Sequence, residues 1–410
     1  MMSNPASSEV FLNRQPILNS QQEQVGCELM SGNGDGEASD RSPTDAARLV
    51  CAAYGEPDVR HALGHHTIFL RTDPEFLYDD AVGLLPVDGV VIQLMLEQAP
   101  DGKLLERCRT LREQRHSLAL ADYRGLDERS SPLLTLVDFI GIDVRDKDAR
   151  QLAALTGPLA RLPLKLLAQG VDTPEDFAHC RDSGFQCFQG LSLAPPEAVE
   201  GRRPAVSRTT LLRLVELVER SAESADVEAC IERDPALVLK LFSIASAIAH
   251  DFSRRIGSLH QAVHVLGRRR LKRWLYLLSS MTPADADCAP PLKVAALRAY
   301  MLKTLAGRLR SGSDTEFVDR AFITGLMSMV PAALDLSMDE ILKLVTLEQE
   351  IVAALRGREG PLGALLALIE CYDDENAEGC DRCLAGFANA GFDRALLDAC
   401  LTNALRWFTG

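Results

Sequence analysis

The stretch LKLLAQGVDTPEDFAHCRDSGFQCF, residues 164–188, contains the pattern that decides the fold of the first half of the chain. Its residues form a short apolar run at Leu164–Ala168, a helical pattern at Pro174–Ser183 and a second apolar run at Phe185–Phe188. A helix between two short apolar strands is typical of a βαβ unit, in which the two strands lie parallel.

The same alternation extends back toward the start of the chain. It predicts further strands at Val10–Arg14, Thr67–Arg71, Val90–Met95, Ser117–Ala121 and Phe139–Asp143, and further helices at Ala46–Ala53 and Lys103–Gln114. So many short units in half a chain favour a small closed (β/α) barrel over an open sheet.

The pattern changes after Ala194–Ser207, a segment with three prolines and a Gly-Arg-Arg turn that is typical of a linker. From Thr210 onward, apolar residues recur every three or four positions, which predicts amphipathic helices throughout. The predicted fold class is therefore α/β plus all-α. The barrel is expected over residues 8–196, the linker over 197–207 and an all-helical domain over 208–400.

Composition excludes several classes of protein. Of 410 residues, 47% are hydrophobic and 25% are charged, which is typical of globular chains. The net charge of −14 falls almost entirely before residue 201 and makes general binding of nucleic acid unlikely. The eleven scattered cysteines, the lack of a signal-like start and the lack of an uncharged apolar stretch of membrane-spanning length predict a cytoplasmic protein with no membrane span.

Several motifs resemble two bacterial signalling domains. The stretches Arg14–Ile17 (RQPI) and Val25–Met30 (VGCELM) resemble the opening of an EAL domain. In the second half, Asp234–Leu237 (DPAL), Ile256–Gly267 (IGSLHQAVHVLG) and Ala321–Ser328 (AFITGLMS) resemble an HDOD domain. Their order and spacing make the chain similar to proteins that couple a variant, degenerate EAL domain to an HDOD domain.

The resemblance to EAL domains implies a TIM-like barrel that hydrolyses cyclic di-GMP, a bacterial second messenger. Such a reaction uses divalent cations held by carboxylates and an amide at the carboxyl ends of the strands. The family's site residues can therefore be compared with this chain one position at a time.

Some of those positions are kept and others differ. The signature glutamate is Glu28, one of two paired aspartates is Asp122, a later acidic position is Asp172 and a late glutamine is Gln189. At the other positions this chain has a different residue from the family. It has Gly32 where the family has an arginine, Arg71 where it has an asparagine, Gln93 where it has a glutamate, Ala121 where it has an aspartate, Gly141 where it has a lysine and Gln169 where it has a glutamate.

These differences remove negative charge from the implied metal site, and Arg71 adds a positive charge there. We therefore expect a degenerate phosphodiesterase site with no catalytic residues, no metal and no cofactor. Glu28, Asp122 and Asp172 are more simply interpreted as solvated or structural carboxylates. Arg71 is expected to form an internal ion pair with Glu28 or Asp122.

The first hypothesis for function is a catalytically inactive signalling scaffold. It would act by contacts with other signalling proteins in the cyclic di-GMP network, since the HDOD resemblance implies protein–protein contacts in motility, stress and biofilm regulation. The alternatives are a receptor that binds cyclic di-GMP or another nucleotide without hydrolysis, and a phosphodiesterase with weak residual activity.

Two polar clusters in the second half allow a functional and a structural interpretation. Arg268, Arg269, Arg270, Lys272 and Arg273 form a possible basic contact patch, but we favour the solvated face of an amphipathic helix over a nucleic-acid site. His260 and His264 lie one helical turn apart without an evident third ligand, so a helix surface is favoured over a metal site.

Overall fold

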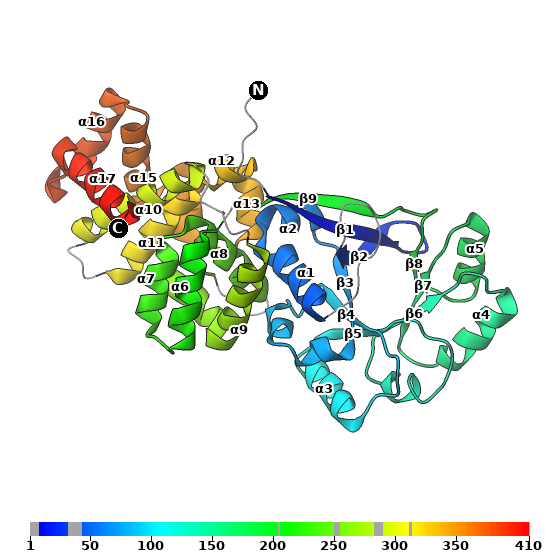
Figure 1. Cartoon of the computed structure of the whole chain (residues 1–410). Helices are drawn as coiled ribbons and strands as arrows, with labels where there is room; N and C mark the ends of the chain where they lie inside the picture. Colours follow the sequence, from blue (N-terminus) through cyan, green and yellow to red (C-terminus); the bar gives the residue numbers. More distant parts are fainter. Residues whose placement is uncertain are drawn as a thin grey trace. The chain divides into compact units, whose positions relative to one another are not determined.

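The computed structural model describes residues 8–31, 43–203, 206–249, 255–282, 290–310 and 314–409 (Figure 1). These residues fall into two compact units. The barrel unit comprises Glu9–Ala53 and Ala62–Gly201, and the helical unit comprises Tyr54–His61 and Arg202–Gly410. The short segment Tyr54–His61 thus belongs to the helical unit, although the chain on both sides of it belongs to the barrel unit.

The barrel unit is built from strands connected largely by helices. The strands are β1 (Ser8–Leu18), β2 (Gln24–Ser31), β3 (Thr67–Thr72), β4 (Val90–Leu94), β5 (Ser117–Leu120), β6 (Phe139–Asp143), β7 (Lys165–Gln169), β8 (Cys187–Gln189) and β9 (Glu197–Arg203). The helices are α1 (Pro43–Gly55), which ends in the helical unit, α3 (Gly102–Glu113), α4 (Ala149–Thr156) and α5 (Pro174–Asp182). Figure 1 shows α3, α4 and α5 on the outside of the strands.

The strands close into a ring. Strands β2 to β8 pair in sequence order as parallel neighbours, and β1 pairs antiparallel with both β2 and β8. Closure leaves no free edge between β1 and β8, and β9 is added beside β1. The predicted (β/α) barrel is confirmed, and the predicted strands are present with small shifts at their ends.

Two strands lie where no strand is predicted. Strand β2 forms a hairpin with β1, with Leu18 and Gln24 as the last paired residues before a turn at Asn19–Glu23. Strand β9 covers Glu197–Arg203, the first part of the predicted linker. It contains none of the three prolines of that segment, so its backbone amides remain available for a sheet. The predicted domain boundaries stay a prediction.

The barrel interior is arranged in layers. One apolar layer consists of Ile17, Phe69, Val91, Ala119, Leu167 and Cys187, with Phe139 packed against it. Side chains alternate between the two faces of a strand, so the next inward position lies two residues further along. In the parallel strands β3, β4, β6, β7 and β8 these next positions are Arg71, Gln93, Gly141, Gln169 and Gln189, toward the carboxyl ends.

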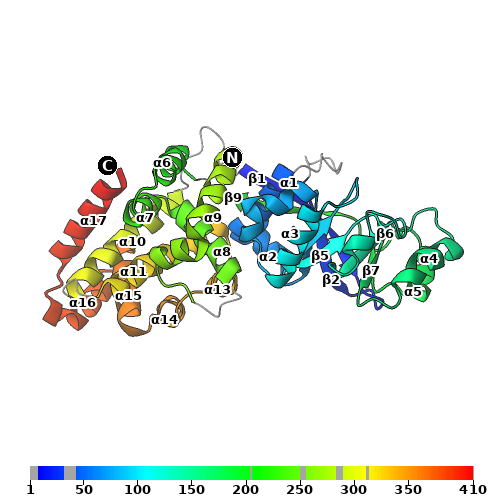
Figure 2. The same ribbon diagram turned by 90° about the horizontal axis from the view of Figure 1, so that it is seen from below.

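The helical unit confirms the predicted all-helical second half (Figure 2). Its helices are α2 (Pro57–Leu63), α6 (Arg208–Glu219), α7 (Ser224–Glu232), α8 (Pro235–Ala249), α9 (Leu259–Met281), α10 (Pro290–Leu309), α11 (Thr315–Met327), α12 (Val330–Leu334), α13 (Met338–Leu344), α14 (Gln349–Gly357), α15 (Gly360–Asp373), α16 (Ala377–Gly386) and α17 (Arg394–Thr409). Helix α10 packs against α11, α15 and α17.

Helix α8 is the centre of this unit, because all of its residues are buried. It begins as predicted, with Pro235 in the first turn and the Asp234 carboxylate accepting a hydrogen bond from the Leu237 amide at 3.1 Å. The Asp234 carboxylate also accepts a hydrogen bond from the Ser207 amide at 2.7 Å, which ties the start of α6 to the start of α8.

The segment Tyr54–His61 is anchored to α8 by polar contacts. Lys240 and Glu56 form an ion pair in which both side chains are almost fully buried. The Ser243 hydroxyl donates a hydrogen bond to the Tyr54 carbonyl at 2.7 Å, and Nη1 of Arg60 donates to the Ser243 carbonyl at 3.2 Å. Buried charges persist in proteins where they are paired, so this ion pair explains how α8 tolerates a lysine.

One stretch of the helical unit, Thr315–Leu334, is long and apolar enough to cross a membrane by length and composition. More than half of it is buried within the protein, as expected for helices at the centre of a helical unit, so this feature is weak evidence for a membrane span.

Replacing Lys240 by Met should strongly destabilise the helical unit. The change leaves the Glu56 carboxylate buried without its cation, so we expect the free energy of unfolding to fall by about 3–5 kcal/mol. The double variant K240M/E56L should recover most of that loss, because it buries no lone charge. Urea denaturation followed by circular dichroism measures both. As a control, R109A breaks an exposed ion pair with Glu106 and should cost at most about 1 kcal/mol.

Asp234 should make the stability of the helical unit depend on pH. Burial raises the pKa of Asp234 from 3.8 to about 6. Between these values the folded chain keeps a proton that the unfolded chain releases, so stability falls as pH rises. We expect the difference in unfolding free energy between the wild type and D234N to fall by about 2 kcal/mol from about pH 4.5 to about pH 7. A difference that stays constant across this range would contradict the assignment.

Candidate functional site

The positions identified by the EAL resemblance meet at one end of the barrel. Glu28 on β2, Arg71 on β3, Gln93 on β4, Gln169 on β7 and Gln189 on β8 all belong to the polar inward layer, and Gly141 lies in the same layer on β6. Ala121 and Asp122 follow directly after β5. Gly32 lies outside the described residues.

Arg71 and Glu28 form the predicted internal ion pair. Nε of Arg71 lies 2.8 Å from Oε1 of Glu28, and Nη2 of Arg71 lies 3.4 Å from Oε2. The side chains are only 14% and 6% exposed, respectively, so solvent screens this pair little. Asp122 is instead exposed, with a backbone φ of 49°, and belongs to the loop after β5.

A row of glutamines continues the polar layer from Glu28. Nε2 of Gln189 donates hydrogen bonds to Oε2 of Glu28 at 2.8 Å and to Oε1 of Gln15 at 2.9 Å. Oε1 of Gln189 accepts a hydrogen bond from Nε2 of Gln169 at 3.2 Å. Both oxygens of Glu28 are therefore already in contact with donors from this chain.

Gly141 is explained by its neighbours. A Cβ atom at this position would lie 2.8 Å from Oε1 of Gln169 and 3.1 Å from Nε2 of Gln93. The two amide side chains thus fill the space in which the family's lysine would begin, and a glycine is required for them to approach the strand.

Several buried polar atoms around this point have no hydrogen-bond partner among the described residues. They are both side-chain polar atoms of Gln93, Oε1 of Gln169, the hydroxyl of Tyr123 and Nε of Arg71, which lies at ion-pair distance from Glu28 but without hydrogen-bond geometry. Buried polar groups are normally satisfied, so each marks a place where water or a ligand would complete a hydrogen bond.

A cavity of about 700 Å³ opens beside Arg71 at the carboxyl ends of β3, β5 and β6. It is lined by Arg71, Asp122, Tyr123, Arg124, Asp143, Arg145, Lys147, Gln151, Ala154 and Leu155. Four of these side chains carry positive charge and two carry negative charge. We call this the cationic cavity.

One of its carboxylates is held by its own arginine. Nη2 of Arg145 lies 2.5 Å from Oδ2 of Asp143, and Nε of Arg145 donates to Oδ1 at 3.0 Å. Hydrogen bonding to the Arg145 guanidinium lowers the pKa of Asp143, so this carboxylate stays ionised at neutral pH. Asp172 is exposed and accepts a hydrogen bond from the Leu191 amide at 3.0 Å.

Arg124, Arg145 and Lys147 are site residues that were not predicted from the sequence. Each follows shortly after a parallel strand, Arg124 after β5 and the other two after β6. Charged residues at the carboxyl ends of barrel strands are the signal that identifies them, because these ends converge on one face of a barrel.

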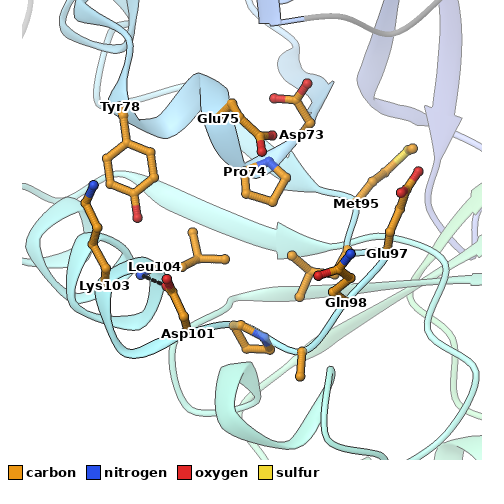
Figure 3. Close-up of a pocket in the computed structure, with 13 residues that line it drawn as sticks. Asp73, Pro74, Glu75, Tyr78, Met95, Glu97, Gln98, Asp101, Lys103 and Leu104 are labelled. Atoms are coloured by element: carbon orange, nitrogen blue, oxygen red, sulfur yellow. Dashed lines mark hydrogen bonds between the residues drawn. The ribbon is translucent and has the colours of Figure 1, made fainter.

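A second cavity, of about 890 Å³, has the opposite charge (Figure 3). It lies between the segments that follow β3 and β4, and the carboxylates of Asp73, Glu75, Glu97 and Asp101 line it. Its one cationic side chain, Lys103, lies 4.9 Å from the centre of the Tyr78 ring. Although it is larger, this acidic groove would repel an anionic ligand and contains none of the predicted site residues.

The residues of the barrel mouth do not fit a pair of divalent cations. Gln93 and Gln169 are neutral where the family has carboxylates, and the guanidinium of Arg71 occupies the side of Glu28 that a cation would approach. Among the described residues, no group of three or more His, Cys, Asp or Glu side chains is arranged to hold a metal ion. We therefore derive no catalytic step through such ions.

The basic cluster of the second half lies on α9, after a break in the helix at Gly267, whose φ is 71°. Leu271, Trp274 and Leu275 on the same helix are buried, as an amphipathic helix requires. Lys272 pairs with Glu219 on α6 at 2.9 Å, and Arg268 donates to the Ala222 carbonyl. At least part of this charged face is thus engaged within the helical unit, and a contact patch there stays a prediction.

His260 and His264 lie on α9 with stacked rings whose centres are 6.5 Å apart. Nδ1 of His260 lies 2.9 Å from Oε1 of Glu228 on α7, an ordinary surface contact.

Comparison with known proteins identifies relatives of the whole chain. The model of the HDOD domain family matches residues 205–350. The chain is 27% identical to the cyclic di-GMP phosphodiesterase CdgJ of Vibrio cholerae, over 97% of this chain and 92% of that protein. It is 22% identical to the uncharacterized protein YuxH of Bacillus subtilis, over 97% of this chain and 98% of that protein.

Solved structures are similar to somewhat less than half of the chain. A manganese and cyclic di-GMP complex of Klebsiella pneumoniae BlrP1 is 20% identical, with a TM-score of 0.39, over 48% of this chain and 58% of that chain. The EAL domain of Mycobacterium smegmatis DcpA is 18% identical, with a TM-score of 0.38, over 46% of this chain and 93% of that chain. The HDOD match and the full-length relatives confirm the predicted resemblance to proteins that couple an EAL domain to an HDOD domain.

The prediction of a catalytically inactive scaffold that is no enzyme is contradicted. The Vibrio cholerae relative, which matches almost the whole chain, is named a phosphodiesterase. The prediction rested on the combined loss of negative charge at the implied metal site and on the positive charge of Arg71. However, Glu28, Asp122, Asp143 and Asp172 all remain as carboxylates at the barrel mouth, and lost positions alone do not establish the rate of a reaction.

Proposed function

We propose that this chain, which joins an EAL-type barrel to an HDOD domain, binds cyclic di-GMP at the mouth of the barrel. The observation that carries this proposal is the cationic cavity, in which Arg124, Arg145 and Lys147 outnumber Asp122 and Asp143 even though Arg71 is paired with Glu28. Cyclic di-GMP carries two phosphodiester groups, and guanidinium groups bind phosphate through paired, charge-assisted hydrogen bonds.

The size and lining of the cavity support the same ligand class. A volume of about 700 Å³ lies in the range of small-molecule sites. Tyr123 lines the cavity, and its buried hydroxyl has no partner among the residues that the structure describes. A ligand with hydrogen-bonding bases and anionic phosphates would satisfy both features. The cytoplasmic location stays a prediction.

Titration with cyclic di-GMP tests the proposal. We expect saturable binding to the full chain by isothermal titration calorimetry, with an affinity that falls as salt concentration rises. Each of R124M and K147M should weaken binding by about three- to tenfold, because each removes one charged contact to phosphate. The control R109M, on the exposed face of α3, should leave the affinity unchanged.

Equal weakening by the control and by the cavity variants would contradict this site. Absence of saturable binding across a wide range of protein and nucleotide concentrations would contradict the proposed ligand.

Hydrolysis of the bound nucleotide is the second candidate function. It is favoured by the full-length similarity to a protein named a cyclic di-GMP phosphodiesterase. The exposed carboxylates of Asp122 and Asp172 form no ion pair with a described residue, so they remain available to a reacting phosphodiester or to water.

We expect slow conversion of cyclic di-GMP to the linear dinucleotide, well below the rate of about 10 s⁻¹ that is typical of enzymes, because Gln93 and Gln169 supply no negative charge. Chromatography of reactions run in EDTA and, separately, in Mg²⁺ or Mn²⁺ measures the product. The variant D122N/D172N should lower the rate at least about tenfold. A rate equal to that of the buffer alone would contradict this second function.

A further inference from the structure

We propose that Arg71 acts as a built-in cation at the barrel mouth, so that the anionic ligand binds there without a divalent metal ion. The inference rests on the proposed function, since it concerns the same cavity and the same ligand. In this view the positive charge that faces the phosphate belongs to the Arg71 side chain and not to a metal ion.

The position of Arg71 supports this role. It lies next to the last residue of β3, directly across from Gln93 in the parallel pairing of β3 and β4, and it lines the cationic cavity. Its Nε and Nη2 atoms contact Glu28, whereas Nη1 has no hydrogen-bond partner among the described residues. The guanidinium is therefore fixed on one side by Glu28 and keeps donors for a phosphate on the other.

The surroundings of Glu28 disfavour a competing metal ion. Oε1 of Glu28 contacts Nε of Arg71, and Oε2 accepts a hydrogen bond from Nε2 of Gln189 at 2.8 Å. A divalent ion would have to displace both of these groups and would lie beside a guanidinium, which repels it.

The neighbouring inward positions do not compensate for that repulsion. Gln93 and Gln169 are neutral, and their amide groups are packed over Gly141 rather than around Glu28. The net charge close to Glu28 is thus already balanced by Arg71. An incoming phosphate, by contrast, meets a guanidinium together with Arg124, Arg145 and Lys147.

A first experiment tests metal exclusion without nucleotide. The full chain is titrated with Mn²⁺, and free Mn²⁺ is followed by electron paramagnetic resonance. We expect no saturable site at micromolar Mn²⁺ in the wild type. We expect R71N, which removes the guanidinium and supplies an amide oxygen, to gain weak Mn²⁺ binding that the added change E28Q abolishes. A wild-type site that disappears in E28Q would overturn the inference.

A second experiment tests ligand binding without metal. Cyclic di-GMP is titrated into the full chain in excess EDTA and again in Mg²⁺. We expect affinities that agree within about twofold. Binding that is lost in EDTA would overturn the inference but leave the proposed function intact. Absence of binding under both conditions would overturn the proposed function and, with it, this inference.

Variants separate a ligand contact from a structural role of Arg71. The double variant R71M/E28Q removes both charges together and should fold, as judged by an unchanged thermal transition. In EDTA it should bind cyclic di-GMP at least about tenfold more weakly, the loss expected for a charged hydrogen bond to phosphate.

The single change E28Q should instead strengthen binding about two- to fivefold, because it removes the negative charge that competes for the guanidinium. A purely structural role for Arg71 predicts no such gain. Unchanged affinity in both R71M/E28Q and E28Q would overturn the inference.

Discussion

The ion pair between Arg71 and Glu28 is the interaction around which the barrel mouth is organised. Both side chains are nearly buried, so each needs the other's charge. The pair sets the hydrogen bonds of Gln189 and, through it, those of Gln15 and Gln169. Beside this pair, Arg124, Arg145 and Lys147 outnumber Asp122 and Asp143 in the lining of the cationic cavity.

The mouth differs from an acidic metal site through linked changes. Two glutamines replace two glutamates, a glycine replaces a lysine, and an arginine replaces an asparagine, in comparison with the EAL pattern. The structure links the first two changes, because the amides of Gln93 and Gln169 occupy the space that a side chain at position 141 would need. The two cavities described above thus differ in the sign of their charge, and only the cationic cavity is electrostatically suited to an anion.

A second buried ion pair stabilises the helical unit. Lys240 on the fully buried helix α8 pairs with Glu56, and Glu56 belongs to a short segment that lies between parts of the barrel in the sequence. That segment is packed as part of the helical unit. The helical unit thus includes residues from the first half of the chain.

The sequence by itself determined most of the fold. Alternating apolar strands and helices predict the barrel, and the period of three to four residues predicts the helical unit. The EAL resemblance adds the prediction that Arg71 pairs with Glu28 or Asp122. Tertiary structure alone decided three features: β9, the transfer of Tyr54–His61 into the helical unit, and the cationic cavity with Arg124, Arg145 and Lys147. All three depend on contacts between residues far apart in the chain, and no local propensity or periodicity encodes which distant strand ends or helices will meet.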